Sequence, residues 1–369
     1  MSERSKATQI TSYPYIALQK LPLSSDKSMI NIKNIRHLGV LTSLLSILIA
    51  LLAGAILVSL TYGVSPLKAY QIMFTSAFVQ KATVGETINI ASAIILTAFA
   101  FALPQKANFW NIGMEGQLYV GALFAGVVGY FINGLPSILH LFLMCLVGFG
   151  GGILAISVPA ILKLRLGVNE ILSTLLMNYI GMDLTFILLF GPLSAGGMPF
   201  SPLILPSARL PLIYGKAHSG ILIVIAVALV LYFLYKKTVF GFELRSVGTN
   251  PDASRYSGID PKLVTLKAAL LGGGFAGLAG ALQVSGVHYY FWEHISHGYG
   301  FFGIITAFLG KFDFFGIVLA GIFFGGIING SKPMSALTGV SSELITLLLG
   351  VIILITVVMY SLESRLRRK

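Results

Sequence analysis

The chain is 369 residues long, with 56% hydrophobic and only 10% charged residues. Soluble domains carry about 25% charged residues, so this composition excludes a soluble globular protein. The net charge of +12 does not indicate binding to a nucleic acid polymer, because the basic residues gather in a few short loops and at the chain ends. The long apolar runs do not alternate with polar residues, which excludes a β-barrel and predicts an all-α, polytopic membrane helix bundle.

The chain begins with a basic segment, residues 1–37, which we expect to form a cytoplasmic tail. A membrane domain follows at 38–362, and a second basic cytoplasmic tail occupies 363–369. Residues 65–78 are amphipathic and too polar to span, so we expect them on the outer surface. The apolar runs predict about ten membrane segments, at 38–62, 84–104, 108–132, 138–162, 168–190, 218–235, 263–286, 299–310, 313–330 and 341–360.

Ten segments and a cytoplasmic amino terminus place the carboxyl terminus in the cytoplasm as well. All but five of the 25 lysine and arginine residues then face the cytoplasm, which supports this orientation. The segment 299–310 is too short to cross a bilayer about 30 Å thick as one helix, so we expect a half-helix there.

Small residues recur at four-residue spacing, a pattern typical of closely packed membrane helices. The sets are Gly121, Ala125 and Gly129; Gly273 and Gly277; and Gly321 and Gly325. The glycine-rich run 272–281 follows no strand and lacks the Lys-Ser/Thr ending of a phosphate loop, so it predicts no nucleotide-hydrolysing site.

Polar residues interrupt the third predicted segment between Phe109 and Val120. A carboxylate such as Glu115 costs about 3 kcal/mol or more in hydrocarbon. In a helix, Asn111 and Glu115 share one face, and Gln117 lies nearby. This face lines a translocation path or joins helices by hydrogen bonds, and the sequence favours neither interpretation.

A second polar stripe lies on the fifth predicted segment, in GVNEILSTLLMNYI at 167–180. Glu170, Thr174 and Asn178 have helical spacing, and Asn169 is related to Ser173 in the same way. Neutral hydrogen-bonding groups suit an uncharged polyhydroxylated or amide-bearing ligand better than an ion. The alternative is helix–helix contact. We favour this stripe as the ligand face, with Asn111 and Glu115 shaping the path.

The longest polar segment between two membrane helices is 236–262. Asn250 is a good helix cap, Pro251 suits the first helical position, and Gly258 suits the end, so a short helix is predicted from Pro251 to Tyr256. Caps at both ends favour a docking element over an ordinary solvated loop.

Histidines cluster in HYYFWEHISH, 288–297, but without the HExxH spacing of a zinc site. We therefore interpret this segment as an aromatic anchor at the membrane interface and not as a metal site. Cys145 is the single cysteine, which excludes a disulfide framework. No arrangement typical of a nucleophilic or intramembrane protease site is seen.

Four motifs together identify a family resemblance: NIGMEGQL at 111–118, GVNEILSTLLMNYI at 167–180, VGTNPDASRYSGI at 247–259 and TGVSSELITLLLGVIIL at 338–354. They resemble the permease subunits of bacterial ABC importers for nucleosides, within the group that includes ribose and branched-chain amino acid permeases. This resemblance implies a type II-like importer fold, a multi-pass location in the bacterial inner membrane, and transport of a nucleoside or a related sugar-containing solute.

The same resemblance implies that the chain is not an enzyme and that ATP and Mg bind to a partner ATPase. It also implies a second permease subunit, in a heterodimer or a homodimer, and an extracytoplasmic solute-binding protein. A coupling helix would contact the ATPase, and the residues that match it are Thr249, Asn250, Pro251, Asp252, Ala253, Arg255, Tyr256 and Gly258.

Two other functions stay open from the residues alone. A secondary transporter or channel acting by itself would use the intramembrane acids Glu115, Glu170, Asp183 and Glu343 as proton or ion sites. A metal permease or an intramembrane enzyme would use the histidines of 288–297.

Overall fold

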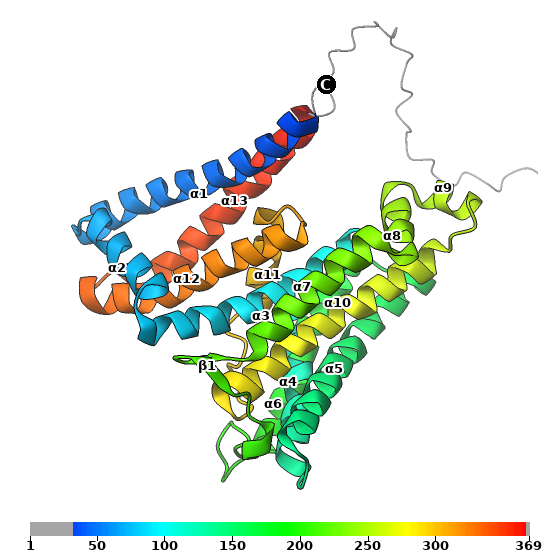
Figure 1. The fold of residues 1–369 in the computed structure, drawn as a ribbon, viewed down its shortest axis with the longest axis horizontal. Coiled ribbons are helices and arrows are strands. Elements are labelled where there is room, and N and C mark those ends of the chain that lie inside the picture. The colour runs from blue at the N-terminus through cyan, green and yellow to red at the C-terminus, as the bar shows by residue number, and fades with distance from the viewer. Residues whose placement is uncertain (1–31, 367–369) are drawn as a thin grey trace, which may run out of the picture. The chain divides into compact units, whose positions relative to one another are not determined.

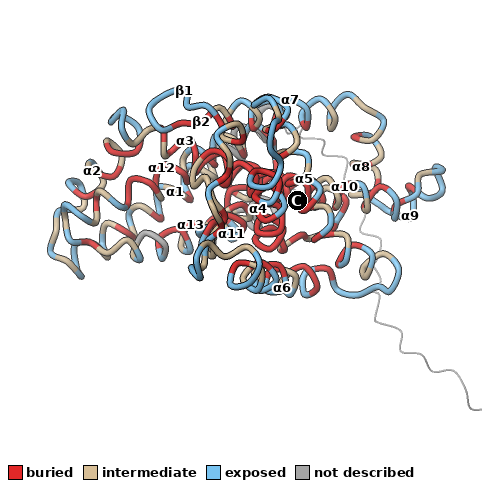
Figure 2. The backbone as a smooth tube through the Cα atoms, turned by 90° about the horizontal axis from the view of Figure 1, so that it is seen from below, coloured by how far each residue is buried: buried red, intermediate tan, exposed pale blue. Residues whose placement is uncertain are grey.

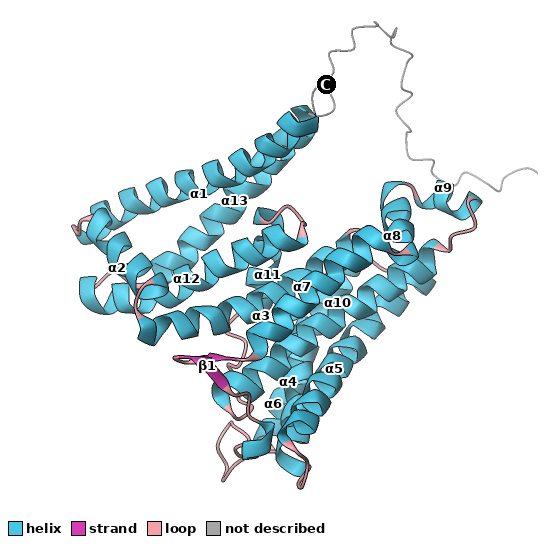
Figure 3. Ribbon diagram, viewed as in Figure 1, coloured by secondary structure: helices cyan, strands magenta, loops and turns pink. Residues whose placement is uncertain are grey.

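The computed structural model describes residues 32–366, so residues 1–31 of the predicted tail 1–37 and residues 367–369 of the predicted tail 363–369 lie outside the described residues. The chain divides into two units, Met1–Leu38 and Gly39–Lys369, and the helix bundle belongs to the second. Most of the described backbone is helical (Figure 3). The α-helices are α1 (Ile32–Tyr62), α2 (Pro66–Phe78), α3 (Lys81–Gln105), α4 (Met114–Phe131), α5 (Ser137–Leu166), α6 (Glu170–Phe190), α7 (Gly220–Lys237), α8 (Val239–Thr249), α9 (Pro251–Tyr256), α10 (Pro261–Gln283), α11 (Tyr299–Leu309), α12 (Phe314–Thr338) and α13 (Ser342–Leu366).

Within the described residues, eight helices are long and apolar enough to cross a membrane. They are α1, α3, α5, α6, α7, α10, α12 and α13, and each matches a predicted segment. The other two predicted segments correspond to α4 and α11. Helix α11 has only 11 residues, as expected of a half-helix. The structure thus shows an all-helical membrane protein with eight candidate spans.

The prediction of a continuous helix over 108–132 is wrong at its start, because α4 begins only at Met114. Helix α3 ends at Gln105, and Asn108 turns the chain with a φ of 58°. The Asn111 side chain then accepts a hydrogen bond from the backbone N–H of Gly113 (3.1 Å), which stabilises a local turn that competes with helix. Asn111 therefore precedes the helix, and it does not share a helical face with Glu115.

The core of the bundle is built around α3, α4 and α10, whose residues are mostly buried (Figure 2). Helix α10 packs directly against the backbones of α4 and α5. A Cβ atom on Gly277 of α10 would overlap the backbone of Gly148 and Gly152 on α5. A Cβ atom on Gly121 of α4 would overlap Gly277. Helix α12 approaches α3 in the same way where Gly325 faces Ala91. The predicted role of these small residues in close packing is confirmed.

The segment between α6 and α7 contains a 3-10 turn, η1 (Pro206–Ala208), and an antiparallel pair of strands. The strands are β1 (Leu212–Tyr214) and β2 (Ala217–His218). Asn89 of α3 holds this hairpin, donating to the Lys216 carbonyl (2.8 Å) and accepting from the His218 N–H (3.1 Å). Helix α7 separates the hairpin from α8 and α9, which lie at the opposite end of the bundle (Figure 1).

Candidate functional site

The nonhelical residues 109–113 and the start of α4 form a buried polar network. The amide groups of Asn111 and Gln117 bond reciprocally: Asn111 Nδ2 donates to Gln117 Oε1 (3.0 Å), and Gln117 Nε2 donates to Asn111 Oδ1 (2.8 Å). Asn111 also donates to the Ala100 carbonyl of α3 (3.2 Å). Both side chains are buried. The network ties the start of α4 to α3.

The stripe on α6 faces this same segment. The Asn178 oxygen accepts from the N–H of Gly116 (2.9 Å), and its Nδ2 donates to the Ile112 carbonyl (2.8 Å). The Thr174 hydroxyl accepts from the Ile112 N–H (3.1 Å). Asn178 therefore satisfies a first-turn N–H of α4 that has no partner within the helix.

The remaining residues of the predicted stripe lie closer to the amino end of α6. Asn169 is exposed and caps α6, accepting from the N–H groups of Ile171 (2.9 Å) and Leu172 (3.2 Å). Glu170 forms an ion pair with Lys163 of α5 (2.8 Å). The Ser173 hydroxyl donates to the Glu170 carbonyl (3.3 Å). These three residues thus make contacts within α6 or to α5.

Glu115 lies in the first turn of α4 and reaches the first turn of α11. Its Oε2 accepts from the N–H of Gly300 (2.8 Å), and a Cβ on Gly300 would overlap Glu115. The Thr97 hydroxyl of α3 contacts the same turn of α11, because it donates a hydrogen bond to the Tyr299 carbonyl (2.9 Å). The carboxylate therefore lies between the amino termini of two helices, whose dipoles stabilise a negative charge.

At one end of the bundle, α9 spans Pro251–Tyr256, as predicted. The Asn250 side chain caps it by accepting from the N–H groups of Asp252 and Ala253 (both 3.0 Å). Gly258 has a φ of 81°, so the chain leaves the helix in a left-handed conformation. Ser254 is buried and bonds to Ser246 of α8 (2.8 Å), whereas Tyr256 is 96% exposed.

The segment 288–297 forms a cluster of rings. The Trp292 ring lies 5.5 Å from His288, 5.5 Å from His294 and 5.6 Å from His297, measured between ring centroids. Among the described residues, no group of three or more His, Cys, Asp or Glu side chains is arranged to hold a metal ion.

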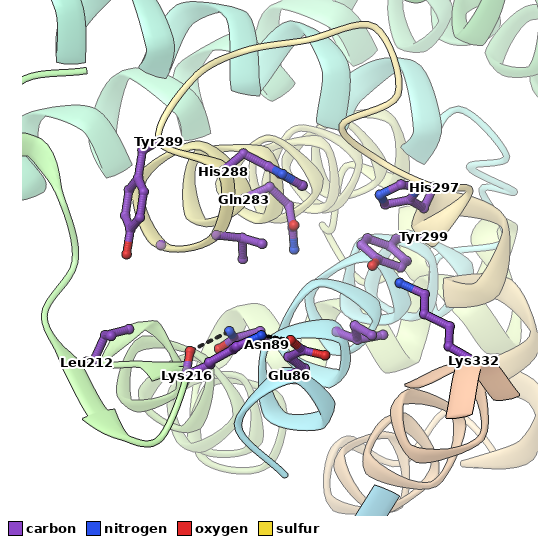
Figure 4. Close-up of a pocket in the computed structure, with 13 residues that line it drawn as sticks. Glu86, Asn89, Leu212, Lys216, Gln283, His288, Tyr289, His297, Tyr299 and Lys332 are labelled. Atoms are coloured by element: carbon purple, nitrogen blue, oxygen red, sulfur yellow. Dashed lines mark hydrogen bonds and ion pairs between the residues drawn. The ribbon is translucent and has the colours of Figure 1, made fainter. Parts of the chain in front are cut away.

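A cavity of about 460 Å³ lies beside this cluster (Figure 4). It is lined in part by the β1–β2 hairpin, which lies at the end of the bundle opposite α8 and α9 (Figure 1). Its polar lining includes Glu86, Asn89, Gln283, Tyr299 and Lys332. Sequence reasoning did not select these residues as site residues. They come from α3, α10, α11 and α12 and share no motif, so no signal in the sequence brings them together.

Comparisons with known proteins place the chain in a family. The family model described as branched-chain amino acid transport system / permease component matches residues 83–357. The guanosine ABC transporter permease protein NupP of Bacillus subtilis is 34% identical over 352 residues, 92% of this chain and 99% of the relative. The glucose ABC transporter permease protein TsgB13 of Haloferax volcanii is 34% identical over 328 residues, 85% of this chain and 86% of the relative. The guanosine ABC transporter permease protein NupQ of Bacillus subtilis is 25% identical over 249 residues, 65% of this chain and 78% of the relative. No solved structure matches the chain.

The matched region includes the polar network at the start of α4, the helices α8 and α9, and the cavity. The family resemblance stated from the sequence motifs is confirmed. The chain belongs to the permease family of branched-chain amino acid transport systems and is a multi-pass membrane transport component, not an enzyme.

Proposed function

We propose that the chain is the membrane-spanning permease subunit of an ATP-driven importer that carries nucleosides or a related sugar-containing solute. The observation that carries this proposal is the similarity to the guanosine permease NupP, which extends over 92% of this chain. In this proposal ATP and Mg bind to a separate ATPase, and an extracytoplasmic binding protein delivers the solute.

The segment Thr249–Gly258 is the proposed docking site for the ATPase. Its short helix presents Pro251, Asp252, Arg255 and Tyr256 to the surface. Because Asn250 caps the helix and Ser254 bonds to α8, this surface is held in one conformation before any partner binds. A preformed surface loses less conformational entropy on binding.

The contacts inside the bundle support a route from this docking site to the path. A Cβ on Gly248 of α8 would overlap the Lys106 carbonyl, and Asn108 Nδ2 donates to the Gly248 carbonyl (2.9 Å). Residues 106–108 lead directly into the network of Asn111 and Gln117. Movement of α8 and α9 would therefore displace the start of α4 and the contact of Glu115 with α11.

We propose that Asn111, Glu115 and Gln117 shape the translocation path by holding the starts of α4 and α11 in place. Discontinuous helices at such positions are a recurring feature of transport sites. Since Glu115 already occupies the amino termini of both helices, the arrangement favours an uncharged solute over an anion. The contact of Asn169, Glu170, Ser173, Thr174 and Asn178 with the solute stays a prediction, and Thr174 and Asn178 bond to residues 112–116 in this conformation.

The proposed topology has ten segments with both termini in the cytoplasm, counting α4 and α11 with the eight candidate spans. It places α8 and α9 on the cytoplasmic side, where the ATPase would be. Because the chain matches both NupP and NupQ of one organism, we propose a heterodimer with a paralogous permease.

Reconstitution with the copurified ATPase and second permease tests this function. We expect ATP hydrolysis that is stimulated by a nucleoside and its binding protein, and uptake that depends on ATP. Asn250→Ala should reduce the stimulation severalfold, because loss of the cap loosens α9 by about 1 kcal/mol. Asn250→Asp, which keeps a capping oxygen, is the matched control. Uptake driven by a proton gradient without ATP would favour a secondary transporter instead.

A further inference from the structure

The cavity described above has the size of a small-molecule site. Its volume of about 460 Å³ falls within the range of about 300–1,000 Å³ that is typical of ligand pockets. Its walls come from α3, the carboxyl end of α10 with the π-helical turn η2 (Val284–His288), the β1–β2 hairpin, α11 and α12. In the proposed topology it opens toward the side from which a solute arrives.

Two buried polar groups point into this cavity and have no hydrogen-bond partner among the described residues. Gln283 is 2% exposed and Tyr299 is 5% exposed, and Figure 4 shows the amide of the first and the hydroxyl of the second directed into the space. Neither side chain makes a hydrogen bond to the described part of the protein. Because both polar ends face the space of the cavity, they are free to bond to a ligand that reaches them together.

Flat rings form one side of the cavity. The His297 ring lies 6.0 Å from Tyr299 and 6.1 Å from His288, measured between centroids. Burial lowers the pKa of His297, and the nearby Lys332 lowers it further, so the ring is neutral at neutral pH. Neutral imidazole and phenol rings offer faces on which a nucleobase can stack, worth about 1–3 kcal/mol per base.

The charged side chains of the lining lie at the rim, where they are exposed or half-buried. The Glu86 carboxylate is paired with the Lys216 ammonium group, which leaves Lys332 as the remaining cationic side chain among the lining residues. Deeper in the cavity the polar groups are an amide, a hydroxyl and imidazoles. This combination suits an uncharged solute that carries both an aromatic ring and hydrogen-bonding groups.

We propose that this cavity is a solute-binding site of the permease itself and that its ligand is a nucleoside, with the base against His297 and Tyr299 and hydrogen bonds to Gln283 and the Tyr299 hydroxyl. The proposal rests on the proposed import function and assigns it a site that is distinct from the network at the start of α4. The two are connected, because Tyr299 directly precedes Gly300, whose N–H bonds to Glu115.

The position of Trp292 provides a direct binding assay. The chain has two tryptophans, and Trp292 contacts the rings of His288 and His297, which line the cavity. The full-length Trp110→Phe variant is purified with its accompanying subunits in lipid nanodiscs. It is titrated with guanosine and, separately, with glucose, and the fluorescence of Trp292 is recorded. We expect a saturable change with guanosine and none with glucose at the same concentrations.

Gln283→Leu should weaken guanosine binding about tenfold, and Tyr299→Phe, which removes only a hydroxyl, about threefold. The matched control is Gln71→Leu, an exposed glutamine on α2. Guanosine binding that is unchanged in both cavity variants would overturn the site, and a response to glucose alone would overturn the ligand class. If both variants also import guanosine with unchanged KM, the transport function stands and the site is wrong. If wild-type protein imports no nucleoside or sugar with ATP, the transport function itself fails.

Discussion

Two buried polar regions of this bundle differ in how their polar groups are satisfied. At the start of α4, Asn111, Gln117 and Asn178 bond to each other or to backbone groups. In the cavity at the other end of α3, Gln283 and Tyr299 are equally buried and point into open space.

This difference distinguishes polar side chains that stabilise the fold of a membrane protein from polar side chains that are available to bind a ligand. Where a side chain bonds to a helix terminus, it replaces water that the bilayer does not provide, and its removal destabilises the fold. Where a side chain faces a cavity, its removal leaves the fold intact and weakens the binding of a ligand. Four measurements test this comparison, beginning with the largest expected effect on stability.

Asn178→Leu should destabilise the protein most. The substitution leaves the Gly116 N–H and the Ile112 carbonyl without the partner that Asn178 provides, at a cost of about 2–6 kcal/mol for the two groups. Thermal unfolding of the purified protein in nanodiscs measures it, with the exposed neighbour Tyr179→Phe as control. An unchanged unfolding temperature would mean that the network does not hold α4.

Glu115→Leu should destabilise by about 1–3 kcal/mol, because the Gly300 N–H loses its acceptor. Glu115→Gln keeps an oxygen at the same place and should recover most of this loss. Equal unfolding temperatures for the two variants would argue against a hydrogen bond from α11 to this side chain.

Acidification should loosen the hairpin beside the cavity. His218 lies in β2, outside the membrane helices, and burial lowers its pKa from 6.5 to about 4. Its Nδ1 accepts from the Gly220 N–H (3.1 Å), so the folded state needs the neutral ring. The stability that it contributes is complete above pH 6.5 and is lost as the pH falls toward 4, at about 1.4 kcal/mol per pH unit.

Comparison of wild type with His218→Gln between pH 7 and pH 4.5 isolates this effect, since glutamine does not titrate. We expect the difference in unfolding temperature between the two proteins to change with pH over this range. Parallel pH profiles would show that His218 does not titrate on unfolding.

Gln283→Leu should have the smallest effect on stability, within about 0.5 kcal/mol, because no protein group loses a partner. The same variant should show the weakened guanosine binding described above. A loss of stability as large as that of Asn178→Leu would remove the distinction between the two regions.

Much of the fold was predictable because hydrophobic runs of spanning length have one stable arrangement in a bilayer, a helix with all its backbone groups bonded. Eight candidate spans match predicted segments, and α9 was predicted to the residue from Asn250, Pro251 and Gly258. Caps are local, since they act on backbone groups two or three residues away, and the sequence alone specifies them.

The start of α4 was not predictable in the same way. Apolar composition continued the helix back to residue 108, but the side chain of Asn111 bonds to Gly113 and Gln117 and the chain turns at Asn108. The sequence did not predict the partner of Glu115 either, because Gly300 is 185 positions away in the chain.

The amino-acid sequence by itself therefore determined the helical membrane class, the family and the capped helix α9, because these depend on composition, motifs and local backbone chemistry. Only the tertiary structure decided which buried polar groups are bonded and which face a cavity. That distinction depends on contacts between α3, α4, α6, α10 and α11. The periodicity of residues within one helix does not predict which side chains of another helix will contact it.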